Sequence, residues 1–310
     1  MPALEAAAFR LGETLAVDEA PAAEISEFRR MVIDAAAAGQ SLAALFGRAI
    51  EDDRVRLYAV LADRENGLLS LLTTDVAEHY PALTPECPQA HWFEREIAEQ
   101  WGVVPDGHPW LKPIRFHASY RPPHDAWSRA PDAAIRPGVT EFFRVEGDGI
   151  HEVAVGPIHA GVIEPGHFRF QCYGEQVLHL EISLGYQHRG VERALVGGPV
   201  ARTIHYLETL SGDTTIGHAT AYCQALEALA GCQPPLAAEA IRGVALELER
   251  LACHAGDLGA LAGDVGFLPT ASFNGRLRGD FLNATALICG SRFGRGLVRP
   301  GGVSFGLDAA

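Results

Sequence analysis

The sequence predicts an α+β fold with a small N-terminal α/β sandwich domain, a proline-rich connector, and then a β-hairpin region and a helical bundle. Three observations support this. Runs of alternating apolar and polar residues recur in the first and middle parts of the chain, as expected for half-buried strands. Seven prolines lie between positions 105 and 137, too many for a helix or a central strand. A long stripe of apolar residues at helical spacing follows Pro235.

Composition excludes several classes of protein. The 310 residues are 48% hydrophobic and carry a net charge of -14, so the chain can fill large cores but lacks the clustered cations that nucleic acid requires. Six cysteines occur without a Cys-x-x-Cys pair, which favours buried free thiols over disulfides. No glycine-rich turn after a strand supports NAD binding.

The sequence predicts no direct membrane span. It contains no run of about 18 apolar residues and no signal-peptide pattern at its start. We therefore expect a cytoplasmic chain that is peripheral to the inner membrane and reaches it only through partner subunits.

The N-terminal elements follow from local patterns. An Ala-rich amphipathic segment predicts a helix over 22–44, and alternation predicts paired strands over 54–62 and 68–74. Residues 89–101 predict a second helix that ends at Gly102. These elements make a small α+β domain.

The later elements divide into a hairpin and a set of helices. Alternation predicts strands over 168–172 and 178–184, and helical patterns over 201–231 are interrupted at 212–215. A short helix is predicted over 280–289. The long helix after Pro235 is predicted to bury one stripe, formed by Ala237, Ile241, Val244, Leu248, Leu251, Ala255 and Leu258.

Residues 92–111 read WFEREIAEQWGVVPDGHPWL and resemble the signature of the 30-kilodalton, or NuoC-like, subunit of respiratory complex I. Glu99 stands where that family usually has Asp. The resemblance implies a NuoC-like domain over 1–112, followed by the connector over 113–148. We expect Glu94, Arg95 and Glu96 to form a charged, solvated or subunit-facing surface at the helix start.

Residues 156–192 contain Gly-Pro-x-His, Glu-Pro-Gly-His-Phe-Arg and His-Arg-Gly-x-Glu in order. This string resembles the N-terminal part of the large subunit of group 4 nickel-iron hydrogenases of the formate-hydrogenlyase type, and of the complex I 49-kilodalton (NuoD) subunit. The resemblance implies that His159 and His167 line a quinone pocket and that Glu164 lies on a proton route. Alternatively, the two histidines satisfy backbone groups.

Residues 211–222 read SGDTTIGHATAY, where the hydrogenase relatives have Cys-Gly-x-Cys, three residues, and then His. Ser211 and Thr214 thus occupy the positions of two metal-binding cysteines. Hydroxyl groups cannot replace thiolates on nickel, so these are degenerate metal-ligand positions and no metal is expected. His218 aligns with the family histidine and, with Glu164, is a candidate catalytic residue.

Further charged residues are predicted to have structural or interface roles. Arg189 and Glu192 are spaced as an ion pair at a helix start. Glu247, Arg250 and His254 share a helix face and predict a buried or interfacial ion network. An Arg-Pro-Gly-Gly turn at 299–302 matches the family, whose large subunits continue further. The large-subunit-like domain over 149–310 is therefore expected to be truncated at its C-terminus.

These observations favour a subunit of a membrane-associated electron-transfer complex of the hydrogenase and NADH:quinone oxidoreductase superfamily. Its expected partners are a NuoB-like small subunit with an iron-sulfur cluster and membrane subunits. The chain alone is expected to bind no cofactor, although a quinone site is possible. The alternative is a non-catalytic structural or assembly paralogue, and whether the chain itself is an enzyme stays open. A stand-alone metalloenzyme is least supported, because no His or Cys pair has ligand spacing.

Overall fold

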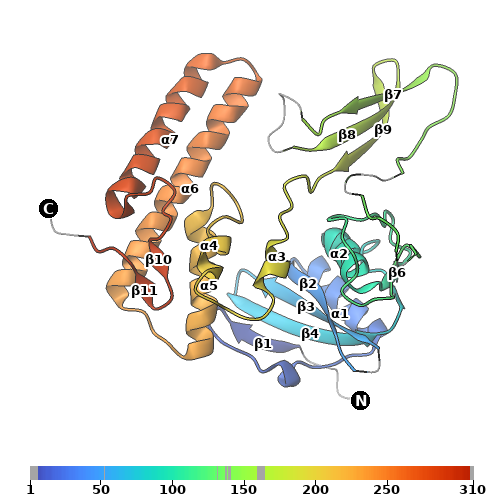
Figure 1. Cartoon of the computed structure of the whole chain (residues 1–310), viewed down its shortest axis with the longest axis horizontal. Helices are drawn as coiled ribbons and strands as arrows, with labels where there is room; N and C mark the ends of the chain where they lie inside the picture. The colour runs from blue at the N-terminus through green and yellow to red at the C-terminus, as the bar shows by residue number, and fades with distance from the viewer. Residues whose placement is uncertain are drawn as a thin grey trace. The chain divides into compact units, whose positions relative to one another are not determined.

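The computed structural model describes residues 6–51, 53–130, 132–136, 138, 141–158 and 165–307. The chain divides into two compact units, Met1–His188 and Arg189–Ala310. Antiparallel sheets characterise the first unit and long packed helices the second (Figure 1). The predicted α+β class is confirmed at this level. The predicted limits of the three domains stay a prediction, and the division between the compact units falls after His188.

A four-stranded antiparallel sheet forms the centre of the N-terminal region. Its strands lie in the order β1 (Ala7–Arg10), β4 (Leu68–Val76), β3 (Val55–Asp63) and β2 (Ser41–Ala49). Helices α1 (Ile25–Ala37) and α2 (His91–Trp101) pack on it. Alternate residues of β3, such as Leu57 and Leu61, are buried in one core with Phe28 and Ile97 of the helices. This two-layer arrangement confirms the predicted strand pair and the second helix.

The first helix ends earlier than predicted. Instead of continuing to residue 44, α1 stops at Ala37, and Gly39 adopts the left-handed region with φ of 93°. The chain then enters β2, whose Leu42 and Leu45 are buried in the core. Alanine-rich sequence favours a helix, but burial of these leucines against the sheet outweighs that local preference.

Short elements complete this region. The 3-10 turns η1 (Val17–Glu19) and η2 (Pro88–Ala90) precede the two helices, and β5 (His79–Pro81) pairs in parallel with β6 (Val104–Asp106). The described residues between β6 and position 149 form no helix or strand, in agreement with the predicted proline-rich connector.

A separate three-stranded antiparallel sheet follows the connector. It has β8 (His167–Tyr173) between β7 (Ile150–Val155) and β9 (Gln176–Ser183). The predicted hairpin is confirmed as β8 and β9. The sequence analysis missed β7, because its run of His, Glu and Val does not alternate clearly.

The two faces of this sheet differ in character. One face carries Glu152, Arg169, Gln171 and Glu181, and connector residues including Phe143 pack on it. The opposite face is apolar, and several of its side chains are exposed by 37–41%: Val153, Val155, Leu180 and Ile182. The chain thus covers the polar face of the sheet and leaves the apolar face open.

The second unit is built from helices. In chain order these are α3 (Val191–Leu195), α4 (Thr203–Leu207), α5 (Thr215–Ala230), α6 (Leu236–Asp264) and α7 (Leu268–Cys289). A small pair of strands, β10 (Val298–Arg299) and β11 (Gly302–Val303), follows them. The predicted break before Thr215 and the long helix after Pro235 are confirmed. The last helix begins 12 residues before the predicted position 280.

The stripe that α6 buries differs from the predicted one. Its buried positions are mostly small residues: Ala238, Ile241, Arg242, Ala245, Glu249, Ala252 and Ala255. Val244, Leu251 and Leu258 were predicted to be buried but are 40–57% exposed. Small side chains allow close helix packing, as where Gly259 approaches Asn274 of α7. None of the helices in the described part of the chain is long and apolar enough to span a membrane.

Candidate functional site

The signature helix α2 of the first unit has its charged residues buried rather than solvated. Glu94 is fully buried and accepts hydrogen bonds from the backbone amides of Leu83 and Thr84 at 2.7 and 2.9 Å. It also accepts one from the Thr84 hydroxyl at 2.5 Å. The expectation of a charged surface at this helix start was wrong for Glu94 and Arg95, because both side chains bind backbone groups of folded-back loops.

Arg95 lies between two indole rings. Its guanidinium carbon is 4.6 Å from the ring centroid of Trp92 and 4.8 Å from that of Trp110. It donates to the carbonyl oxygens of Lys112 at 2.8 Å and Pro113 at 3.2 Å. Burial lowers the pKa of Arg95 to about 10, so it remains a cation at neutral pH and fixes the start of the connector by charge-assisted hydrogen bonds.

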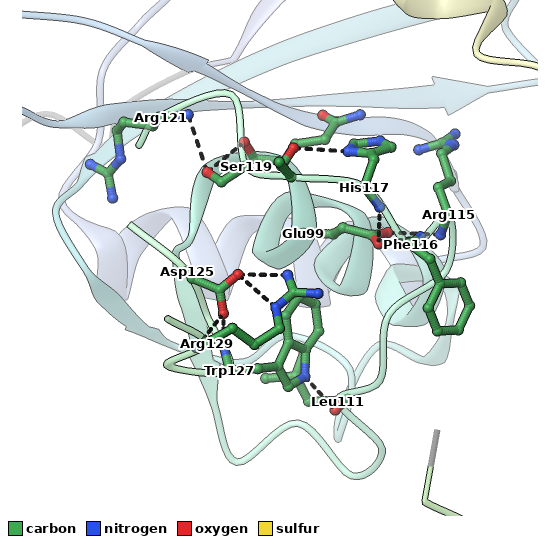
Figure 2. A network of polar contacts seen from close by, with 12 residues as sticks. Glu99, Leu111, Arg115, Phe116, His117, Ser119, Arg121, Asp125, Trp127 and Arg129 are labelled. Carbon is green, nitrogen blue, oxygen red and sulfur yellow. Dashed lines mark hydrogen bonds and ion pairs between the residues drawn. The ribbon is translucent and has the colours of Figure 1, made fainter. Parts of the chain in front are cut away.

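Glu99 organises the next part of the connector (Figure 2). Its carboxylate accepts four backbone hydrogen bonds, from Ile114 at 3.1 Å, Arg115 at 2.8 Å, Phe116 at 2.5 Å and His117 at 3.4 Å. Because an irregular segment leaves its amides without sheet or helix partners, one buried carboxylate satisfies what secondary structure normally would. The acid that the resemblance places here is therefore a structural anchor.

Two further side chains, Arg121 and Trp127, fix the path of the connector. Arg121 donates to the carbonyl oxygens of Trp101 at 3.0 Å and Asp53 at 2.7 Å. Trp127 donates from its indole nitrogen to the carbonyl of Leu111 at 3.2 Å. The connector is thus tied to α2 and to the turn between β2 and β3.

A small cavity lies between this network and the second sheet. It is lined by Trp92, Arg95, Trp110 and Lys112 on one side and by Glu181 and neighbouring β9 residues on the other. Its free volume is about 20 Å³, enough for roughly one water molecule. The space does not suit a quinone or a nucleotide.

The predicted quinone-pocket residue His167 has both ring nitrogens engaged. Its Nδ1 lies 3.1 Å from the carbonyl oxygen of Gly156, and its Nε2 accepts from Arg169 Nε at 3.2 Å. A carbonyl can only accept, so the ring carries its proton on Nδ1. This matches the alternative in which the histidine satisfies backbone groups. His159 and Glu164 lie outside the described residues, so their predicted roles stay predictions.

In the second unit, a buried carboxylate of α6 binds the start of α5, directly after the turn that holds Ser211 and Thr214. Glu249 of α6 accepts from the backbone amides of Ile216 at 2.6 Å and Gly217 at 3.0 Å. These amides belong to the first turn of α5, where a carboxylate is favoured. Burial nevertheless raises the pKa of Glu249 above its usual value.

Ser211 and Thr214 form one turn, since the Thr214 amide donates to the Ser211 carbonyl at 3.4 Å. Between them, Asp213 pairs with Arg278 at 2.7 Å, and the Cys253 thiol lies 3.5 Å from the Asp213 carbonyl. A cavity of about 10 Å³ adjoins these groups. His218 is half-buried in the first turn of α5.

This donor set does not fit a nickel-iron centre. Ser211 and Thr214 supply only hydroxyl groups. The nearby carboxylate of Glu249 already accepts two backbone hydrogen bonds. Cys253 supplies a single thiol, and burial raises its pKa. Nickel shared with iron requires deprotonated thiolates in pairs. Across the described ranges, no cluster of three or more His, Cys, Asp or Glu side chains could hold a metal ion.

The predicted structural residues are found on exposed surfaces. Arg250 pairs with Glu247, and both side chains are 58% exposed; His254 is also exposed. Arg189 donates to the Leu210 carbonyl at 3.3 Å, and its predicted pairing with Glu192 stays a prediction. Whether these residues contact another protein of a complex also stays a prediction.

The buried ion pair of the second unit was missed by the sequence analysis. Arg242 donates twice to Glu227, at 2.7 and 3.1 Å, and also to the carbonyl oxygen of Gly302 at 2.9 Å. The Gly301 amide donates to Glu227 at 2.7 Å. The available signal was the Arg-Pro-Gly-Gly turn, whose tight backbone leaves polar groups that need partners.

The fold is that of an α+β chain whose antiparallel sheets are followed by long packed helices. Residues 19–130 match the family described as respiratory-chain NADH dehydrogenase, 30 Kd subunit. This part of the chain is therefore a complex I 30-kilodalton domain.

The particular relatives extend the similarity over most of the chain. It is 31% identical to hydrogenase-4 component G of Escherichia coli K12 over 242 residues, which cover 76% of this chain and 43% of the relative. It is 31% identical to formate hydrogenlyase subunit 5 of the same organism over 235 residues, covering 72% and 41%. The C/D subunit of NADH-quinone oxidoreductase from Bdellovibrio bacteriovorus is 26% identical over 225 residues, covering 69% and 40%.

The chain spans less than half the length of these relatives. Beyond the 30-kilodalton domain, the chain is similar to subunits of hydrogenases and of NADH-quinone oxidoreductases.

Proposed function

We propose that this chain is a subunit of a membrane-associated electron-transfer complex, in which it packs against an iron-sulfur small subunit and holds no nickel of its own. In this proposal the chain is cytoplasmic and reaches the inner membrane through its partners. It provides surfaces that other subunits bind, and electron transfer through an iron-sulfur cluster takes place in the partner.

The observation that carries the proposal is the turn at Ser211 and Thr214. Its two hydroxyl residues replace the thiolates of the hydrogenase pattern, and the surrounding polar groups already have partners in Glu249 and Arg278. Restoring a metal centre would require both new ligands and the release of these contacts. A docking role uses the scaffold without that chemistry.

The open apolar face of the β7–β9 sheet supports the docking part. Contiguous exposed apolar side chains on an otherwise folded surface favour a protein interface. Leu180 and Ile182 lie on this face and are 41% and 37% exposed.

The metal part is tested by elemental analysis of the chain purified with an iron-sulfur small subunit of the same superfamily. We expect iron from the partner and nickel well below one atom per chain. Stoichiometric nickel would contradict the proposal.

The docking part is tested by co-purification of the same pair. We expect Leu180→Glu combined with Ile182→Glu to weaken binding at least about tenfold, because two charges would be buried in an apolar contact. Leu11→Glu is the matched control, since Leu11 is 84% exposed but lies outside this sheet. Equal binding by all three proteins would refute this use of the face.

The second candidate function is a non-catalytic structural or assembly subunit that binds no quinone. Both ring nitrogens of His167 bond to protein groups, which favours this alternative over a quinone ligand role at that position. A quinone analogue can be titrated against the chain with its cluster-bearing partner. Saturable binding that is lost in His159→Ala supports the quinone site, whereas no binding by the unaltered pair supports the assembly role.

A further inference from the structure

Residues 111–116, which we call the strap, belong to the last part of the 30-kilodalton domain. They follow α2 in sequence, precede the β7–β9 sheet, and contact both. On the domain side, Arg95 and Glu99 bind only the backbone of the strap, through its carbonyl and amide groups respectively. Of the strap side chains, Arg115 pairs with Glu96 of α2, whereas Lys112 reaches the β7–β9 sheet. The position of the strap is set by a helix whose charged residues are buried.

Lys112 is the only lysine in the chain, and it joins the strap to the sheet. Its Nζ donates to Glu181 of β9 at 2.8 Å and also to the carbonyl oxygen of Glu141. The ammonium lies 5.5 Å from the ring centroids of both Trp110 and Phe142. A compact ammonium with three donors suits this arrangement of two oxygens between two rings.

Glu181 is buried and depends on these contacts. Its side chain is 5% exposed, and it accepts from Lys112 and from the Phe143 amide at 2.8 Å each. Burial alone would raise the pKa of this carboxyl, but the hydrogen bonds from Lys112 and Phe143 outweigh burial and hold it below its usual value. The carboxylate is thus charged where it lies, and Lys112 supplies its countercharge.

The contacts continue from Lys112 to His167. The Phe142 ring has Lys112 Nζ 5.5 Å from its centroid and the Arg169 guanidinium 4.4 Å from it. The His167 ring is 5.3 Å from Phe142, and Arg169 donates to its Nε2. A continuous set of packed groups therefore runs from the strap to the one described histidine of the predicted pocket.

We propose that Lys112 is a positioning residue that fixes the β7–β9 sheet, and with it the His167 ring, to the 30-kilodalton domain through its buried contact with Glu181. The strap is then a rigid coupling and not a flexible linker. The proposal does not depend on quinone binding or on the docking role proposed above.

The test is hydrogen exchange of the full chain. We expect Lys112→Met to speed exchange of the β8 and β9 amides at least about tenfold, because an uncompensated buried carboxylate destabilises the sheet locally. Exchange in β2–β4 should not change. Lys112→Arg keeps the charge and should restore much of the protection.

Asp75→Asn is the matched control. It breaks the Arg56–Asp75 pair, whose side chains are 28% and 19% exposed, and should affect β3 and β4 only. Exchange of β8 and β9 within about twofold of the unaltered chain in Lys112→Met would overturn the proposal. If Lys112→Met does not fold, hydrogen exchange of Glu181→Gln is measured in its place, and the same twofold limit for β8 and β9 applies.

A second readout separates positioning from general loosening. Nitrogen NMR of His167, assigned with His167→Gln, should show the Nδ1-protonated ring in the unaltered chain. In Lys112→Met we expect part of the molecules to have the Nε2-protonated tautomer or a rotating His167 ring. Asp75→Asn should leave the Nδ1-protonated ring unchanged. An unchanged His167 signal in Lys112→Met would refute the coupling to this ring.

Discussion

The Arg242 guanidinium forms a two-point ion pair with the Glu227 carboxylate, and both side chains are at most 6% exposed. The pair joins α5 to α6 and binds the 299–302 turn through Arg299 and Gly302 carbonyls. Three chain segments thus meet at one buried contact between two charges.

Glu227→Gln should destabilise the second unit by about 3–5 kcal/mol, because it leaves the Arg242 charge buried without its partner. The hydrogen bond from Arg242 lowers the pKa of Glu227, so its stabilisation is present above the unfolded pKa of about 4.3 and is lost as pH falls through the lowered value. Urea unfolding at pH 7 and pH 3 measures this. A gap between variant and unaltered chain that widens at acidic pH would contradict the assignment.

The contribution of Glu249 to stability changes with pH in the opposite direction to that of Glu227. Burial raises its pKa, so the folded state binds the proton more tightly, and this contribution is present below the unfolded pKa and is lost as pH rises through the raised value. Glu249→Gln removes the titration but keeps one acceptor oxygen. We expect the stability of the variant relative to the unaltered chain to rise between pH 4 and pH 7. Thermal unfolding across that range tests the trend, and a flat or falling difference speaks against it.

Glu99→Gln should release the connector. The amide oxygen can still accept at one position, but the remaining backbone amides of residues 114–117 lose a charged acceptor, at a cost of about 2–4 kcal/mol. Hydrogen exchange of these amides should rise by more than about tenfold. Glu65→Gln, in an exposed turn, is the control and should change nothing. Retained protection in Glu99→Gln would show that other contacts order the segment.

The cysteines should differ strongly in reactivity. Cys223 is fully buried, and burial raises the pKa of its thiol to about 11, whereas Cys232 is exposed. At pH 8 only about one Cys223 side chain in a thousand is a thiolate. Iodoacetamide should therefore modify Cys232 of the native chain readily and Cys223 only after unfolding. Mass spectrometry of the peptides distinguishes the two, and comparable labelling would be inconsistent with this packing.

Local patterns in the sequence predicted the elements whose burial agrees with their periodicity. Strands β3 and β4, helix α2 and the long α6 are where alternation or caps placed them. The end of α1 was wrong because alanine favours helix in isolation, while Leu42 and Leu45 pack into the sheet core. The buried stripe of α6 was wrong in part, because large side chains were taken as the core although small ones allow close packing.

The site residues were predicted less completely, for a physical reason. Glu247 and Glu249 are two residues apart in one helix, and only contacts with α5 show that Glu249 is the buried one. Glu99 binds amides 15–18 residues away, and Lys112 binds a carboxylate 69 residues away. Composition and spacing carry no information on such distant pairs.

The opposite character of the two faces of β8 fixes the register of its sheet. A shift of one residue would turn Arg169 and Gln171 outward and bring Phe168 and Phe170 against Lys112 and Glu181, leaving a charged pair to face phenyl rings. A mispaired sheet would therefore be less stable than the native one, because its charged side chains would lose their partners. The buried charges thus help to select the native register, as the apolar side chains do.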